Sequence, residues 1–348
     1  MSVLAIFASA HLYIWWRLAL PLPSPWWQVG TAVILLACTV VPFMIRIGRT
    51  LARERARPWV LYGSLWFGLA VYLLLGAAVS HVAVAFGADP QRAAIYSALG
   101  AVAVVLAGIV NVARGALVRH VTVPLAGLPI EKYTIVQLTD VHIGPIIGRE
   151  FAEQVVRRVN ALKPDAIVIT GDLVDGHVAE LRPHIEPFRQ LRARDGVFAV
   201  TGNHEYYWNA NAWLEHIRSL GIRVLRNEHV LVADAVVIAG VDDSTQTEDV
   251  PRAVADRPPA LPLVLLAHHP RTVERAQKAN VDLQLSGHTH GGQLLPLGWL
   301  ARLFDPKVAG LKQFGATWLY VSQGTGFWGA PLRVGTTCEI AAITLVPA

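Results

Sequence analysis

Aspartate, asparagine and histidine side chains recur in the second half of this sequence, in short groups that could bind metal ions. The set comprises three carboxylates, one amide and up to six imidazoles: Asp140, Asp172, Asp175, Asn203, His142, His204, His268, His269, His288 and His290. Such oxygen and nitrogen ligands, without a thiolate, suit Mn, Fe, Zn or a similar divalent ion. A single catalytic zinc takes about three protein ligands, so this set predicts two ions that share a bridging carboxylate. Two ions about 3.5 to 4 Å apart are the usual apparatus for in-line displacement at phosphorus.

The stretch GHTHGG places two of these histidines one residue apart among glycines. In an extended segment, alternate residues point to the same side, so His288 and His290 can both face the site and reach different ions. Gly287, Gly291 and Gly292 permit backbone torsions closed to other residues and let the chain lie close to ions and substrate. We therefore expect an extended, closely packed segment here.

Each ligand group follows a short apolar run that is typical of a buried strand. The runs are YTIVQLT, AIVIT, VFAVT, PLVLLA and DLQLS. Helical patterns at 150–162 and 211–220 alternate with them. Strand and helix in alternation predict an α/β sandwich, and open α/β sheets bind their ligands at strand ends.

Five motifs in this order, DVH, GDLVD, GNHE, AHHP and GHTHGG, resemble the calcineurin-like metallophosphoesterase family over residues 131–346. The resemblance implies a four-layer αββα metallophosphoesterase sandwich with a dinuclear site. It assigns one ion to Asp140, His142, Asp172 and His290. It assigns the other ion to Asp172, Asn203, His268 and His288, with Asp172 bridging.

The resemblance also implies the chemistry. His204 would be the catalytic histidine that protonates the leaving oxygen or stabilises the transition state, and Asp175 would orient it. An imidazole suits that task because its unperturbed pKa of about 6.5 lets it donate a proton near neutral pH. The nucleophile would be a metal-bound hydroxide, and manganese is among the ions expected.

Several polar residues near these motifs have simpler interpretations. His269 adjoins a proposed ligand, but side chains on a strand alternate faces, so we favour His268 as the ligand. Asp242 and Asp243 follow the run VVIAG, and a turn or cap role is the simpler interpretation. Glu205 is expected to close a hydrogen bond near the site rather than to bind metal.

The first part of the chain is dominated by long uncharged runs, within a sequence that is 53% hydrophobic. A helix needs about 20 apolar residues to cross a bilayer core, and four runs are long enough: 3–20, 27–47, 59–86 and 93–113. We predict a membrane domain of about four transmembrane helices at 1–115, a linker at 116–130 and the metallophosphoesterase domain at 131–348. Whether 3–20 crosses the membrane stays open.

Charge predicts the orientation. The segment RIGRTLARERARP carries Arg46, Arg49, Arg53, Arg55 and Arg57. Arginine and lysine mark cytoplasmic loops, so we expect an integral protein of the inner or plasma membrane with its catalytic domain in the cytoplasm. From Arg114 onward, 23 basic residues balance 23 acidic ones, and the net charge of +5 lies in the membrane part. Nucleic acid is therefore not the expected partner.

Membrane attachment and the segment GTGFWGAPLRVGTTCEI also resemble bacterial members related to UDP-2,3-diacylglucosamine hydrolases. This favours a lipid or nucleotide-linked lipid precursor as substrate, a phospholipid or lipid A intermediate for example, and the bilayer as partner. Residues 296–311 carry a stripe that is either core or a lid leaning on the membrane: Trp299, Leu300, Leu303 and Phe304. Arg333 is either a phosphate clamp or a surface residue.

The expected function is that of a metal-dependent hydrolase acting on a phosphate ester or phosphoanhydride bond. Two alternatives stay open. One is a nuclease or cyclic-nucleotide phosphodiesterase on the same fold, and the other is a membrane sensor that uses its metals structurally. A sensor would be expected to have lost a ligand or the catalytic histidine, and this sequence keeps all of them.

Overall fold

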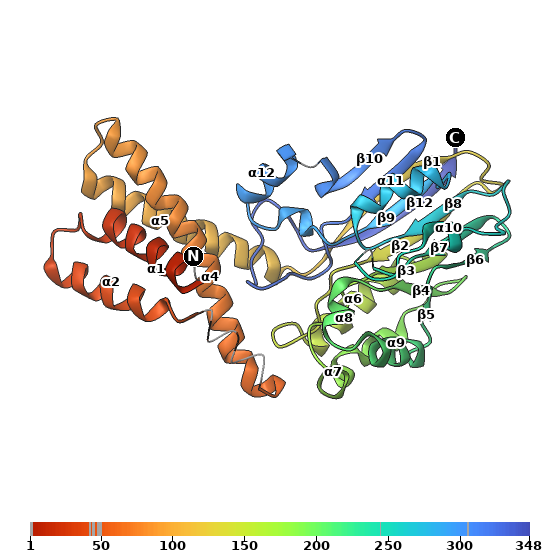
Figure 1. Ribbon diagram of the computed structural model, residues 1–348, viewed down its shortest axis with the longest axis horizontal. Helices are drawn as coiled ribbons and strands as arrows, with labels where there is room; N and C mark the ends of the chain where they lie inside the picture. The colour runs from red at the N-terminus through yellow and green to blue at the C-terminus, as the bar shows by residue number, and fades with distance from the viewer. Residues whose placement is uncertain (1–2, 42, 44–45, 47–50, 244, 305) are drawn as a thin grey trace. The chain divides into compact units, whose positions relative to one another are not determined.

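The computed structural model describes the chain except for residues 1–2, 42, 44–45, 47–50, 244 and 305, and except for the side chains of 3, 299, 301–302, 304 and 306. The chain divides into two compact units (Figure 1). One contains Met1–Ala113 together with Gly329–Val334, and the other contains Arg114–Trp328 with Gly335–Ala348. The chain thus leaves the second unit once, near its end, to add a short segment to the first.

The helical unit consists of α1 (Val3–Ile14), the π-helical turn η1 (Trp15–Ala19), α2 (Pro25–Cys38), α4 (Arg53–Ala85) and α5 (Pro90–Ala113). Among the described residues, α4 with 33 residues and α5 with 24 are long and apolar enough to cross a membrane. The first two predicted spans correspond to shorter helices, α1 with 12 residues and α2 with 14. Part of the second span, and Arg49 of the basic segment, lie outside the described residues.

Glycines let other backbone and side chains approach α4 and α5 closely. A Cβ on Gly76 would lie 2.9 Å from the carbonyl oxygen of Ser97, so the two helices pack with little between them. Leu332 from the Gly329–Val334 segment lies against Gly68 and Gly108. These small residues therefore create room for the segment.

Hydrogen bonds hold the Gly329–Val334 segment on α5. The backbone N–H of Arg333 donates to the carbonyl oxygen of Gly108 at 3.1 Å, and Nδ2 of Asn111 donates to the carbonyl oxygen of Arg333 at 3.0 Å. The Arg333 side chain is 1% exposed. The expectation that Arg333 lies at the surface was therefore wrong.

Two mixed sheets form the second unit. The first has the order β1 (Leu117–Leu125), β12 (Glu339–Pro347), β2 (Tyr133–Leu138), β3 (Ala166–Thr170), β4 (Val197–Val200) and β5 (Arg223–Val224). The second has the order β10 (Gly310–Phe314), β11 (Thr317–Val321), β9 (Leu283–Ser286), β8 (Leu263–Leu266), β7 (Val236–Gly240) and β6 (Glu228–Val232). The range 116–130, expected as a linker, contains β1, which pairs with β12 in parallel.

The two sheets share one apolar core. Ile135 and Val168 of the first sheet meet Val264 and Leu285 of the second in this core. Alternate residues of each strand face outward to the helices, as expected for strands buried on both faces. Figure 1 shows α6 (Arg149–Ala161), α7 (Val178–Ile185) and α9 (Ala210–Ser219) along the first sheet, and α10 (Val250–Ala253) and α11 (Val273–Lys278) along the second.

The predicted α/β class and its four layers are confirmed, and α6 and α9 correspond to the helices expected at 150–162 and 211–220.

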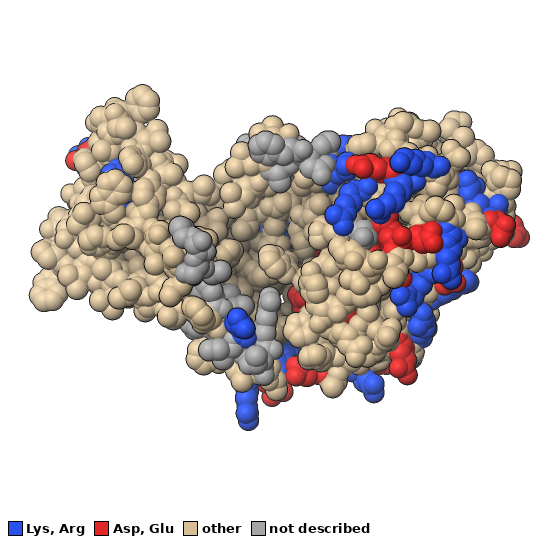
Figure 2. All heavy atoms as spheres, in the orientation of Figure 1, with Lys and Arg blue, Asp and Glu red and all other residues tan. Residues whose placement is uncertain are grey.

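Charged side chains are distributed unevenly between the two units. Figure 2 shows most of them on the second unit, whereas those visible on the helical unit lie mainly at its edges and leave a broad uncharged face. An apolar surface of this kind suits contact with lipid chains.

Candidate metal centre

The chemistry-bearing residues follow the carboxyl ends of five strands. Asp140 and His142 follow β2, Asp172 follows β3, Asn203 follows β4, His268 follows β8, and His288 follows β9. Strands β2, β3 and β4 are parallel, and so are β7, β8 and β9, so these ends meet at one edge of each sheet. The strand-end pattern seen in the sequence therefore becomes a single site.

Many site residues have a left-handed backbone. The residues with positive φ include Asp140 (51°), His142 (53°), Asp172 (53°), His288 (70°) and His290 (50°). This conformation is uncommon for residues other than glycine, although Asp and His adopt it more readily than most. Concentration of such residues in one place is typical of functional sites, where the surrounding structure must enforce them.

The same torsions correct one expectation. His288 and His290 do not lie on an extended segment, because both are left-handed and Thr289 between them is helical, with φ −82° and ψ −13°. A tight turn, η4 (His290–Gly292), directs the two rings to different partners. The close approach expected at Gly287 is confirmed, since a Cβ there would collide with Thr139 and Asp140.

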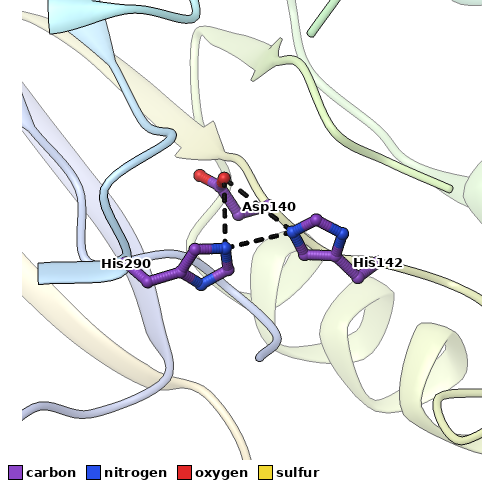
Figure 3. Close-up of side chains that lie close together, drawn as sticks. All are labelled: Asp140, His142 and His290. Atoms are coloured by element: carbon purple, nitrogen blue, oxygen red, sulfur yellow. Dashed lines mark hydrogen bonds and ion pairs between the residues drawn. The ribbon is translucent and has the colours of Figure 1, made fainter. Parts of the chain in front are cut away.

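One candidate metal group consists of Asp140, His142 and His290 (Figure 3). Nε2 of His290 lies 3.5 Å from Oδ1 of Asp140, and Nε2 of His142 lies 4.0 Å from the same oxygen. The two imidazole nitrogens are 3.1 Å apart. Three potential ligand atoms thus converge on one point.

Asp172 takes part in two further groups, one with His268 and His288 and one with His142 and His204. Its Oδ2 lies 3.2 Å from Nε2 of His268, 4.0 Å from Nε2 of His142 and 3.8 Å from Nε2 of His204. Nδ1 of His288 is 3.3 Å from Nε2 of His268. Asp172 therefore lies between the imidazoles of both proposed ion sites.

The residues present fit divalent ions. The Asn203 side chain is buried, and its Oδ1 has no hydrogen-bond partner within the part of the chain that the structure describes. A buried carbonyl oxygen of this kind is costly unless something binds it. Carboxylate, amide and imidazole atoms packed this closely could hold metal ions, and the ions would satisfy all of them.

Asp175 contacts two imidazoles from one carboxylate. Its Oδ2 lies 3.1 Å from Nδ1 of His142, and its Oδ1 contacts Nδ1 of His204. Both rings then direct Nε2 toward Asp172. Asp175 can therefore set the tautomer and orientation of a candidate ligand and of the candidate catalytic histidine together.

Burial and the mixed charges shift the pKa values strongly. Burial lowers the pKa of His142 and His268, but the carboxylates around them outweigh it and raise these pKa values to about 9 and about 10. Burial raises the pKa of Asp172 and Asp175, but the neighbouring imidazoles hold both well below the usual range. Burial, followed by His268 and His269, lowers the pKa of His288 to about 4.

Glu205 supports the backbone rather than joining a metal group. Its carboxylate accepts hydrogen bonds from the backbone N–H groups of Gly202 (2.7 Å), Asp172 (3.0 Å) and Leu173 (2.7 Å). Burial and the Asp172 charge raise the pKa of Glu205 to about 7. The expected hydrogen-bonding role is confirmed, and it ties the β3 and β4 ends together.

The histidine pair after β8 diverges as strand alternation predicts. His268 joins the group around Asp172, and its Nδ1 lies 2.8 Å from the carbonyl oxygen of Thr170. His269 faces Asp243 instead. The sequence interpretation missed this contact, although the run VVIAG before Asp243 has the same strand-then-carboxylate pattern as the other groups.

Comparison with known proteins agrees with this geometry. A family model described as calcineurin-like phosphoesterase matches residues 133–292. A Bos taurus protein named "Transmembrane protein with metallophosphoesterase domain" is 40% identical over 68% of this chain and 59% of its own length. An uncharacterized metallophosphoesterase of Helicobacter pylori is 36% identical over 61% of this chain and 60% of its own length.

An uncharacterized metallophosphoesterase of Aquifex aeolicus is 37% identical over 63% of this chain and 92% of its own length. The chain thus spans only about three fifths of the bovine and Helicobacter relatives but nearly all of the Aquifex one. The family match and this coverage show that the chain belongs to the calcineurin-like metallophosphoesterase family.

Proposed function

We propose that this protein is a membrane-anchored phosphoesterase that uses two divalent ions to hydrolyse a phosphate ester or phosphoanhydride. Asp140, His142 and His290 would hold one ion, His268, His288 and Asn203 the other, and Asp172 both. The observation that carries this proposal is the position of Asp172, which belongs to candidate groups on both sides of the centre. A carboxylate in that position is suited to bridging two ions.

The bound ions would supply Lewis acidity and an activated water molecule. The Nδ1–H of His204 would donate to Asp175, and Nε2–H of the protonated ring would give its proton to the leaving oxygen. Asp175 would stabilise the protonated imidazole and keep its ring directed at the centre. Glu205 would hold the ends of β3 and β4 in register, so that Asp172 and His204 keep their relative positions.

We place the substrate at the membrane, as a lipid or a nucleotide-linked lipid precursor. The two long apolar helices and the printed name of the bovine relative support membrane attachment. Because α4 and α5 are joined by the short segment 86–89, Arg53, Arg55 and Arg57 lie at the same end of the pair as Arg114. Arginines mark the cytoplasmic side, so the second unit is assigned to the cytoplasm.

Thiol labelling tests the orientation. A cysteine placed at exposed Asp234 is expected to react with a membrane-impermeant maleimide only after the cells are opened. Reaction in intact cells would reverse the assignment.

Phosphate release by the detergent-solubilised protein tests the activity. Wild type, His204→Ala and Asp172→Asn are compared after chelation and addition of Mn, Fe, Zn or Mg, on lipid pyrophosphates, nucleotide-linked lipids and aryl phosphates. His120→Ala serves as the control, since His120 is exposed on β1 away from the metal groups. We expect metal-dependent turnover in wild type and control, and a loss of about 10²-fold or more in the two site variants.

Other outcomes favour the alternatives. Turnover that survives His204→Ala would contradict the proposed role of His204. Cleavage of nucleic acid or cyclic nucleotides in preference to lipid substrates, with binding that weakens steeply in salt, would favour the nuclease or phosphodiesterase alternative. Two bound ions without turnover on any substrate, and a His204→Ala variant that is fully functional in cells, would favour the sensor.

A further inference from the structure

Asp243 and His269 form a buried pair beside the metal centre that the proposed chemistry leaves unused. Asp243 follows β7 and is fully buried, and His269 follows β8 and is 9% exposed. Because β7 and β8 are parallel neighbours, both residues arrive at the same edge of the sheet. Nε2 of His269 lies 3.3 Å from Oδ2 of Asp243.

Local hydrogen bonds fix the Asp243 carboxylate. The N–H of Asp243 donates to Oγ1 of Thr201 at 3.0 Å, which ties it to the end of β4. Its Oδ1 accepts hydrogen bonds from the backbone N–H of Thr245 at 2.9 Å and from the Thr245 hydroxyl. The loop therefore uses Oδ1 and leaves Oδ2 directed at His269.

The ring of His269 in turn packs on His288. Their ring centroids are 3.8 Å apart, the shortest such distance among the histidine pairs around the described site. His288 belongs to the candidate group with Asp172 and His268. His269 thus forms one wall for a ring whose Nδ1 faces that group.

Packing against His269 matters for His288 because its ring lacks the contact with a carboxylate or carbonyl oxygen that neighbouring imidazoles make. His142 is anchored through Nδ1 by Asp175, and His268 through Nδ1 by the Thr170 carbonyl. Among the described residues, no carboxylate or carbonyl bonds to the His288 ring, whose Nδ1 faces Nε2 of His268, and its backbone N–H is held by Asp140. Metal-binding histidines ordinarily depend on an anchor of that kind for orientation and affinity.

We propose that Asp243 and His269 are a positioning pair that holds the His288 ring in place for the ion bound with Asp172 and His268. In place of a hydrogen bond to the ligand ring, the pair provides a closely packed, tilted ring that itself faces a carboxylate. This inference rests on the proposed two-ion site, and it concerns the ion on the His288 side alone.

Manganese binding to the full-length protein tests the proposal. Affinity and stoichiometry are measured by competition titration, and coupling between the two ions by electron paramagnetic resonance. Asp243→Asn keeps the shape of the side chain, His269→Ala removes the packed ring, and His269→Phe keeps a ring but removes the ion-pair contact with Asp243. Asp242→Asn is the matched control, because Asp242 is 2% exposed and adjacent but pairs with Arg226 at 2.8 Å.

We expect Asp243→Asn and His269→Ala to lower the affinity for one of the two ions by about 10- to 100-fold. The resonance signal of the coupled pair of ions should then be lost at limiting manganese. His269→Phe should weaken it less than His269→Ala. Asp242→Asn should leave both affinities unchanged even if it lowers the melting temperature.

Wild-type affinity for both ions in Asp243→Asn and His269→Ala would overturn the proposed positioning role. An equal loss of affinity for both ions, or the same loss in Asp242→Asn, would also overturn it. A single ion bound by the wild type would overturn the two-ion site and this inference with it. Two ions bound as expected, without hydrolysis of any substrate, would remove the proposed activity and leave the positioning pair in place.

Discussion

Asp175 links two imidazoles with different proposed tasks, since it contacts His142 on the ligand side and His204 on the catalytic side. Replacing it by asparagine removes the carboxylate charge from the contacts with both rings. We therefore expect Asp175→Asn to lower kcat by about 10²- to 10⁴-fold and to weaken metal binding by about 10- to 100-fold.

Comparison with His204→Ala separates the two effects of Asp175. His204 lies outside the proposed ligand sets, so its replacement should lower kcat and leave metal affinity near the wild-type value. The check is kcat at saturating metal together with a metal titration of both variants. An Asp175→Asn protein with normal metal affinity would show that the contact with His142 is dispensable.

The pKa values of the metal-free centre predict how pH controls metal binding. His142 and His268, with pKa values raised to about 9 and about 10, carry protons at pH 7, whereas His288, lowered to about 4, does not. A metal ion binds neutral imidazole, so binding at pH 7 should release about two protons. Affinity should rise with pH and level off once both raised pKa values are passed.

Calorimetric titration with Mn²⁺ at pH 7, in two buffers of different ionisation enthalpy, measures this proton release. Heats that do not depend on the buffer would mean that His142 and His268 are already neutral. Such a result would mean that no net proton leaves the centre at pH 7, contrary to the raised pKa values of His142 and His268.

At the scale of elements, the strands and their ligand-bearing ends were predictable because buried strands read as short apolar runs and their polar ends stand out against them. The divergence of His268 and His269 followed from strand alternation in the same way. The turn at His288 and His290 was not predictable, because neither residue type signals a left-handed backbone as glycine does. The Asp243–His269 contact joins the residues that follow β7 and β8, and it depends on the parallel pairing of these two strands, which the sheet order reveals.

The position of the Gly329–Val334 segment was also not predictable from the sequence, since nothing in GAPLRV indicates that it packs on α4 and α5. Its fit depends on the missing side chains of Gly68 and Gly108. A Cβ on Gly108 would lie 2.9 Å from Cγ2 of Val334, so Gly108→Val should displace the segment. Displacement would expose Arg333, which is 1% exposed in the folded protein.

Limited trypsin digestion reads this out as cleavage after Arg333. We expect wild type to resist cleavage there and Gly108→Val to be cut readily. Gly100→Val is the matched control, because it lies on the same helix and a Cβ there meets nothing within 4 Å. Equal cleavage of the two variants would mean that altered α5, rather than the lost fit, exposes the site.

At the scale of the whole molecule, the proposed membrane attachment should favour substrates that lie in the membrane. The predicted stripe of the 296–311 segment falls on α12 (Leu297–Phe304), where Leu300 is 51% and Leu303 is 79% exposed. The side chains of Trp299 and Phe304 lie outside the described residues. Core packing, one of the two expectations for this stripe, is therefore wrong for the two leucines.

Exposed leucines on a helix beyond the η4 turn favour the other expectation, a lid that contacts acyl chains. We expect Leu300→Ser combined with Leu303→Ser to lower kcat/KM about 10-fold or more for a lipid-linked phosphate in vesicles, because about 1.5 to 3 kcal/mol is available from burying each leucine. Turnover of a small aryl phosphate should change little, since such a substrate has no chain to bury. Leu231→Ser on β6, where the leucine is 40% exposed, is the matched control. Equal losses of kcat/KM on both substrates would mean that α12 has only a structural role in the domain. An equal loss in the control would mean that general surface polarity, and not the lid, causes the effect.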